Sequence, residues 1–143
     1  MQTDETDSAL MALLSENARL PVATLARRLG LARTTVQARL DRLEATGAIA
    51  GYTLRRGAVA RPPLHATALL SVEPRSGAAV LARLKTLPQV TRVHTTSGRF
   101  DMIVELAADS TATLDDTLDR IGESRGVRSS ESLIHLSTKL DRA

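Results

Sequence analysis

The chain has 143 residues, of which 43% are hydrophobic and 24% charged, and its formal net charge is +3. This composition is typical of a folded protein rather than a disordered one, and the length allows one medium domain or two small ones. No cysteine is present, which excludes disulfides, thiol nucleophiles and cysteine-ligated zinc.

Two further classes are disfavoured by the sequence. No apolar run approaches the roughly 20 residues that a membrane helix needs, and the acidic start MQTDETD lacks the basic region of a secretory signal. We therefore expect a cytoplasmic protein. Tyr52 and Phe100 are the only aromatic side chains, which are too few for a platform that stacks single-stranded nucleic acid.

A first helix is predicted from about Thr6 to Glu16, with Asp4 or Thr6 as its N-cap. Its apolar stripe consists of Leu10, Leu13 and Leu14. We expect this helix to pack behind the two that follow it.

The next segment has the pattern of a helix-turn-helix. Pro21 can open a helix, and apolar residues from Val22 to Leu29 recur at helical spacing until Gly30 ends the helix. After a short turn, a second helix carries Val36, Leu40 and Leu43 at i, i+4 and i+7. Polar and basic side chains lie largely outside that apolar stripe, as DNA-contacting groups do: Arg33, Thr34, Thr35, Gln37, Arg39 and Arg42.

Positive charge is concentrated around this motif. Between Asn17 and Arg61 the chain carries nine arginines against two acidic residues, a net charge of +7. Such an excess attracts a polyanion and supplies the salt-dependent part of DNA affinity. A charge cluster without a motif would more often be a solvated basic face, but here the motif favours DNA.

A short strand or wing is predicted from Ile49, Tyr52 and Leu54. It would make the N-terminal helical domain, called the head below, a winged helix-turn-helix. The segment RRGAVARPP then indicates a linker, because glycine and the proline pair discourage a helix. We predict a three-helix DNA-binding domain over residues 1–54, a linker over 55–64 and a second domain over 65–143.

Strand and helix patterns alternate in the second domain. Strands are predicted over His65–Glu73, Val90–Thr96, Phe100–Ala107 and Val127–Thr138. Ser76 and Ser110 are predicted to cap the two intervening helices. The order βαββαβ is that of a ferredoxin-like split βαβ fold, so the whole chain is assigned to the α+β class.

One face of the predicted sheet is left uncovered by the helices. The first and third strands carry apolar residues on both faces, Leu69 and Ile103 among them. A second copy of the chain usually covers such a face, so we expect a homodimer, which can extend to a tetramer or octamer. Two paired heads can also address two half-sites about one duplex turn apart.

Taken together, these elements resemble the Lrp/AsnC, or feast/famine, family of transcription regulators over almost the whole chain. The resemblance rests on the segment from Leu25 to Tyr52 and on a Gly-x-x-Asp element, Gly98 to Asp101, between the second and third strands of the second domain. Either element alone would be a weak signal, because both folds serve many functions.

The resemblance implies that Leu31 to Thr46 contains the recognition helix of a sequence-specific regulator that binds double-stranded DNA. Its N-terminal half would enter the major groove and bring Arg33, Thr34, Thr35 and Gln37 to the base edges. Phosphates would be contacted by basic groups around it: Arg39, Arg42, Arg27, Arg28 and Arg55. The alternative for Thr34 and Thr35 is capping of the helix N-terminus by their hydroxyls.

The resemblance also implies a small-molecule effector, with an amino acid as the expected class, in a cleft at the subunit interface. Gly98 would let the ligand approach the backbone, and Asp101 can accept hydrogen bonds from an α-amino group. The alternatives are a hairpin glycine and an aspartate that caps its turn. Arg99 replaces the small or acidic residue of many relatives, and it either pairs with a ligand carboxylate or faces water.

Two other functions remain open from the sequence. An architectural protein would bind DNA without an effector. A tetrapyrrole decarboxylase built on the same modules would use His65, His94 or His135, although a histidine in a strand is more often a hydrogen-bonded residue than a catalyst. The basic helix argues against an enzyme, and we expect no catalytic residue, metal site or cofactor, since no phosphate-binding glycine run or paired-histidine motif is present.

Overall fold

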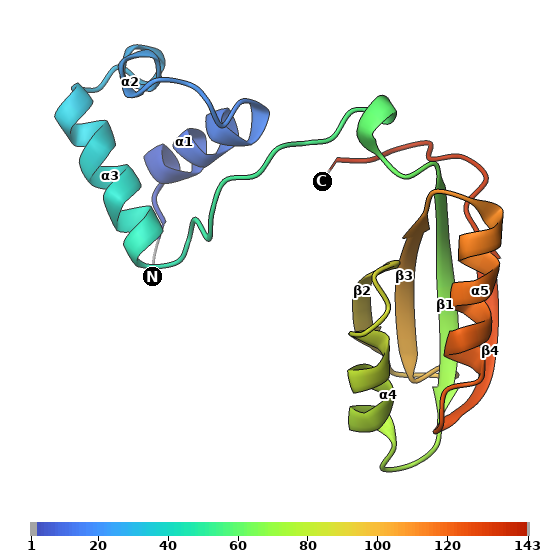
Figure 1. Ribbon diagram of the computed structural model, residues 1–143. Helices are drawn as coiled ribbons and strands as arrows, with labels where there is room; N and C mark the ends of the chain where they lie inside the picture. Colours follow the sequence, from blue (N-terminus) through green and yellow to red (C-terminus); the bar gives the residue numbers. More distant parts are fainter. Residues whose placement is uncertain (1–2, 143) are drawn as a thin grey trace. The chain divides into compact units, whose positions relative to one another are not determined.

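The computed structural model describes residues 3–142. The chain divides into two compact units, Met1–Arg56 and Gly57–Ala143, and each unit has its own hydrophobic core (Figure 1). Within the described residues, no helix combines the length and the apolar character needed to span a bilayer.

The first unit contains three helices: α1 (Glu5–Glu16), α2 (Val22–Leu29) and α3 (Arg33–Ala45). Asp4 is the N-cap of α1, as predicted, and forms a capping box with Asp7. Gly30 ends α2 in the left-handed conformation with φ 67°. A residue without a Cβ adopts this conformation at little cost, which is why the helix ends there.

A shared core holds the three helices together. Its buried members come from every helix and are Leu10, Leu25, Ala26, Val36, Leu40 and Leu43. The stripe predicted on α3 is therefore confirmed as the buried face of that helix. Partly buried residues, Leu20 and Ile49 among them, pack around this core.

The strand predicted from Ile49 to Leu54 is not formed, so this prediction was wrong. Residues 50–57 lie outside any helix or strand, and a short 3₁₀ turn, η1 (Ala58–Ala60), follows them. A strand needs a neighbouring strand to pair its backbone groups, and the first unit, made of helices, offers none among the described residues.

The second unit is a four-stranded antiparallel sheet with two helices, which confirms the predicted ferredoxin-like order. The strands are β1 (Leu64–Val72), β2 (Val90–Thr95), β3 (Met102–Ala108) and β4 (Val127–Ile134), arranged β2-β3-β1-β4. The helices are α4 (Gly77–Leu84) and α5 (Thr111–Gly122), and both lie on one face of the sheet (Figure 1).

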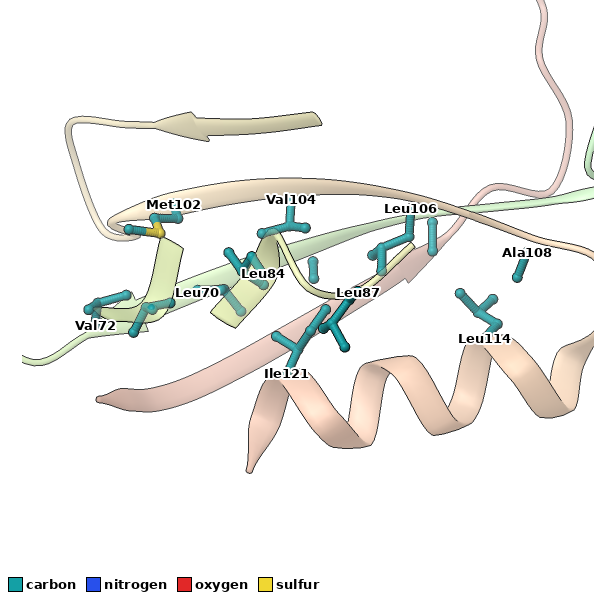
Figure 2. Packing of buried hydrophobic residues seen from close by; sticks show 13 residues of the cluster. Leu70, Val72, Leu84, Leu87, Met102, Val104, Leu106, Ala108, Leu114 and Ile121 are labelled. Atoms are coloured by element: carbon teal, nitrogen blue, oxygen red, sulfur yellow. The ribbon is translucent and has the colours of Figure 1, made fainter. Parts of the chain in front are cut away.

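The core of this unit lies between that face and the two helices. Alternate residues of β1 and β3, such as Leu70 and Val104, point toward Leu84 of α4 and Ile121 of α5 (Figure 2). Ala66 and Ala68 are small and fully buried. The alternation leaves every second residue of β1 and β3 on the opposite face, which no described helix covers.

Strand β3 begins later than predicted and strand β4 ends earlier, each for an identifiable reason. Strand β3 begins at Met102 rather than Phe100, because the amide of Asp101 donates to the carbonyl of Leu70, at 2.8 Å, outside the regular ladder. Strand β4 ends at Ile134 rather than Thr138. Further pairing would bring it beside Pro62 and Pro63, which have no N–H to donate.

The predicted caps of the two helices have different outcomes. The hydroxyl of Ser110 accepts a hydrogen bond from the amide of Thr113, as expected. Ser76 occupies the N-cap position of α4, but its side chain makes no capping bond. Its backbone conformation is helical, with φ −96° and ψ −3°, rather than the extended conformation from which a cap side chain reaches back.

A close backbone contact beside β4 generates a test of this packing. Gly126 has φ +97°, and a Cβ there would lie 2.6 Å from Cβ of Ser76. We expect Gly126→Ala to lower the free energy of unfolding by at least about 1–3 kcal/mol, the usual cost of such a backbone conformation. Gly122→Ala is the control, since a Cβ there meets nothing within 4 Å. Equal stability of the two variants in chemical denaturation would contradict this packing.

Candidate nucleic-acid interface and effector loop

The turn between α2 and α3 fixes where the candidate recognition helix begins. The amide of Leu31 donates to the carbonyl of Ala26, at 2.9 Å, which closes the end of α2. Ala32 then adopts an extended conformation as the N-cap of α3, with φ −71° and ψ 149°. Helix α3 therefore starts at Arg33, and its first five residues include all those predicted to reach base edges.

The four predicted base-contacting residues are all exposed near the start of α3. Arg33, Thr34, Thr35 and Gln37 are exposed, while Val36 is buried in the core. Ala32 is the N-cap and makes no side-chain capping bond. Within residues 3–142, the hydroxyls of Thr34 and Thr35 make no hydrogen bond, so neither acts as the alternative helix cap.

Gln37 is oriented by an acidic residue that the sequence patterns did not single out. Its amide nitrogen Nε2 donates to Oδ1 of Asp41, at 2.8 Å, one turn further along α3. This bond leaves one N–H and the amide oxygen of Gln37 available, which is the donor and acceptor pair that adenine matches.

Two of the arginines predicted to contact phosphates, Arg39 and Arg42, are held by carboxylates at the start of α1. Arg39 Nη1 lies 2.7 Å from Oδ2 of Asp4 and 3.0 Å from Oδ1 of Asp7, and Arg42 Nη2 lies 2.5 Å from Oδ2 of Asp7. The Asp7 side chain is 0% exposed, whereas those of Arg39 and Arg42 are 26% and 49% exposed. Both arginines thus bridge the buried carboxylate and the surface.

These ion pairs change the electrostatics that the sequence suggested. The hydrogen bond from Arg39 lowers the pKa of Asp4, and the same bond raises the pKa of Arg39. Acidic residues at the start of the chain therefore neutralise part of the net charge of +7 carried by residues 17–61. One signal was present in the sequence, because Asp4 and Asp7 have the same three-residue spacing as Arg39 and Arg42.

The remaining basic residues lie around this helix. Arg27 and Arg28 are exposed in the last turn of α2. Arg55 Nη2 donates to the backbone carbonyl of Glu16, at 3.2 Å, which fastens the segment after α3 to the end of α1. In that segment the hydroxyl of Tyr52 donates to Glu44, at 2.7 Å, and this bond raises the pKa of Tyr52.

An open groove runs along one side of α3. It is lined by Thr34, Thr35, Ala38, Arg39 and Arg42. Hydroxyl and guanidinium donors surround the small side chain of Ala38, so the groove presents hydrogen-bond donors without a bulky obstruction.

The Gly-x-x-Asp element forms the connection between β2 and β3. Gly98 adopts φ +106°, and a Cβ there would meet nothing within 4 Å, so the backbone conformation rather than crowding favours glycine. Asp101 Oδ2 accepts a hydrogen bond from the amide of Val72, at 2.7 Å, which leaves Oδ1 as its other acceptor. Arg99 is exposed, stacks 4.9 Å from the centre of the Phe100 ring and lies 3.9 Å from Glu131.

The uncovered face of the sheet combines apolar and polar side chains in register. Leu69 of β1 is paired with Ile103 of β3. On its other side it is paired with Glu131 of β4. The next row contains the ion pair between Arg92 and Glu105, at 3.3 Å. His65 and His135 stack at the other end, with ring centroids 6.4 Å apart, and His135 Nε2 lies 2.8 Å from the hydroxyl of Thr67.

Comparison with protein families matches both units. A family model for the AsnC-type helix-turn-helix domain matches residues 4–44, and a model for the Lrp/AsnC ligand binding domain matches residues 65–143. Among named proteins, the HTH-type transcriptional regulator FL11 of Pyrococcus furiosus is 27% identical over 138 residues. That match covers 93% of this chain and 89% of the relative.

Solved structures share the fold along the entire chain. AsnC of E. coli matches with a TM-score of 0.92 and 23% identity, over 100% of this chain and 98% of that one. A transcriptional regulator from Neisseria meningitidis, solved in complex with L-Met, matches with a TM-score of 0.89 and 22% identity, over 98% of this chain and 94% of that one. At these identities the likeness concerns the fold.

Proposed function

Since this chain belongs to the Lrp/AsnC family of transcriptional regulators, we propose that it is a sequence-specific regulator that binds double-stranded DNA as a homodimer and responds to a small effector. The observation that carries this proposal is the two-sided character of α3. Its apolar stripe is buried, and the opposite side offers exposed base-reading groups at the start of the helix.

The exposed side of α3 and its side chains suit the major groove of DNA. An α-helix fits that groove, where arginine can donate two hydrogen bonds to guanine and glutamine can pair with adenine. Arg33 and Gln37 are the side chains of α3 proposed for these contacts, with Thr34 and Thr35 beside them. Arg27 and Arg28 at the end of α2 are proposed to contact phosphates.

The uncovered sheet face is the proposed site of dimerisation. Its apolar residues Leu69, Ile103 and Leu133 would otherwise stay in contact with water, and Leu133 is an exposed large hydrophobic residue. A second copy of the same face would bury them symmetrically. The pair of heads could then contact two half-sites.

The effector is proposed to bind near the loop from Gly98 to Asp101. The Neisseria relative in complex with L-Met supports an amino acid as the class to test first. Oδ1 of Asp101 and the guanidinium of Arg99 offer an acceptor for an α-amino group and a donor for a carboxylate. To act as a signal, the ligand must bind one arrangement of the heads more tightly than another.

The DNA assignment is tested with Arg33→Ala. We expect this variant to bind duplexes selected from a randomised pool more weakly by about 1–3 kcal/mol, because a forked arginine–guanine contact has that value. Fluorescence anisotropy measures the affinity. Arg125→Ala is the control, since it removes the same charge from an exposed position in the second unit. Equal affinity of the two variants would remove Arg33 from the interface.

The dimer face is tested with Leu69→Asp. We expect the variant to sediment as a monomer, because the new carboxylate would be buried without a partner in the apolar centre of the interface. Ala82→Asp adds the same charge at an exposed position of α4 and should leave the dimer intact. A wild-type protein that sediments as a monomer at all concentrations would refute the proposed interface.

The effector loop is tested by thermal denaturation with a panel of L-amino acids that includes L-Met. A ligand at about 100 times its dissociation constant should stabilise the wild type by about 2.7 kcal/mol. In Gly98→Ala this ligand-dependent shift should be lost, because the side chain strains the loop at φ +106°. Gly57→Ala, where a Cβ meets nothing within 4 Å, should keep the shift. If no amino acid stabilises the wild type, the proposed effector class is wrong.

A further inference from the structure

We infer that Asp4 and Asp7 are positioning residues for DNA binding: the two carboxylates hold the guanidinium groups of Arg39 and Arg42 at the groove of α3, ready to receive a phosphate. The inference rests on the proposed DNA-binding function and extends it to the N-cap of α1 and one acidic residue of its first turn.

The first step is that the carboxylates are themselves fixed. Asp4 Oδ1 accepts a hydrogen bond from the amide of Asp7, at 2.8 Å, and Asp7 Oδ2 accepts one from the amide of Asp4, at 3.3 Å. This capping box ties both side chains to the first turn of α1. Asp7 is also fully buried, so it cannot turn toward water.

The second step is that the arginines keep most of their donors. A guanidinium group has five N–H donors in a planar fork. Arg39 uses only Nη1 for both of its bonds, and Arg42 uses only Nη2. Within residues 3–142, the other guanidinium nitrogens of these two side chains make no hydrogen bond that competes with a phosphate.

The third step concerns the place to which these donors are held. Arg39 and Arg42 line the same groove as Thr34 and Thr35. An arginine that is already ordered loses less conformational freedom when it binds, and ordering one long side chain weakens binding by about two- to tenfold. The ion pairs with α1 would remove part of that loss in advance.

A competing interpretation makes the opposite prediction. If the carboxylates only neutralise Arg39 and Arg42 and repel the DNA backbone, removal of an acidic charge should tighten binding. If the carboxylates position the arginines, removal should weaken binding even though the net charge of the protein becomes more positive. The sign of the effect therefore separates the two interpretations.

Asp4→Asn in the full-length chain is the decisive variant. Asp4 is 53% exposed, and asparagine is an equally good N-cap, so the helix should be retained, which circular dichroism verifies. Glu5→Gln is the matched control, because Glu5 is an exposed residue in the same turn that takes no part in the ion pairs with Arg39 and Arg42.

We expect Asp4→Asn to bind a selected duplex about two- to tenfold more weakly than the wild type, and Glu5→Gln to bind equally well or more tightly. Arg39→Ala should lower the slope of log K against log salt by about 0.9, the value for one phosphate contact. Asp4→Asn should leave that slope unchanged, and it should have no effect when added to Arg39→Ala. A purely structural role of Asp4 would not produce this dependence on Arg39.

Two results would overturn the inference while leaving the proposed function intact. One is that the wild type binds DNA and Asp4→Asn binds it as tightly as Glu5→Gln does, or more tightly. The other is an unchanged salt slope in Arg39→Ala, which would show that Arg39 makes no phosphate contact. Failure of the wild type to bind any selected duplex would instead overturn both the inference and the proposed function.

Discussion

The rotation of α3 about its own axis is the constraint on which the proposed interface depends. Val36, Leu40 and Leu43 are buried against α1 and α2, so the helix has only one orientation in which its apolar stripe is covered. That orientation sets every other side chain of the helix. It exposes Arg33 and Gln37, and it brings Arg39 and Arg42 beside the first turn of α1. Burial of Asp7 then adds a charged restraint, because a buried carboxylate requires cationic partners.

The second unit follows a similar logic with a sheet in place of a helix. Strands β1 and β3 contribute one set of residues to the core beneath α4 and α5 and another set to the opposite face. Each face of these two central strands therefore has its own set of packing side chains. One face specifies the fold of a single chain, and the other is proposed to specify its pairing with a second. The proposed effector loop lies between β2 and β3, directly after one strand and before the other.

Local signals were sufficient to predict most of the fold. Gly30, Asp4 and the i, i+4, i+7 stripes act within a few residues, and the helix ends and buried faces that they predicted are confirmed. The features that the sequence patterns did not predict depend on contacts between residues far apart in the chain. The predicted strand from Ile49 to Leu54 contains apolar residues typical of a strand but has no neighbouring strand among the described residues. The late start of β3 reflects the hydrogen bond from the amide of Asp101 to the carbonyl of Leu70, which are far apart in the sequence.

The same distinction between local signals and long-range contacts applies to the candidate site. The exposure of Arg33, Thr34, Thr35 and Gln37 could be predicted from helical periodicity alone, although their contacts with bases stay predictions. The ion-pair partners of Arg39 and Arg42 could not be predicted from periodicity, because the ion pairs with Asp7 join residues 32 and 35 positions apart. Residues near Gly98 were assigned by resemblance, and the structure adds that one oxygen of Asp101 is already used within the fold.

The charged residues on the uncovered sheet face have a consequence for the choice of partner. A wholly apolar sheet would accept many surfaces in many registers. Here Leu69 and Ile103 lie beside an Arg92–Glu105 pair and Glu131, so a sheet that slides by one strand or carries the wrong charges would bury an uncompensated ion. In the proposed dimer, these charges would let the chain discriminate its own copy from a related sheet, which would limit mixed assemblies among similar regulators in one cell.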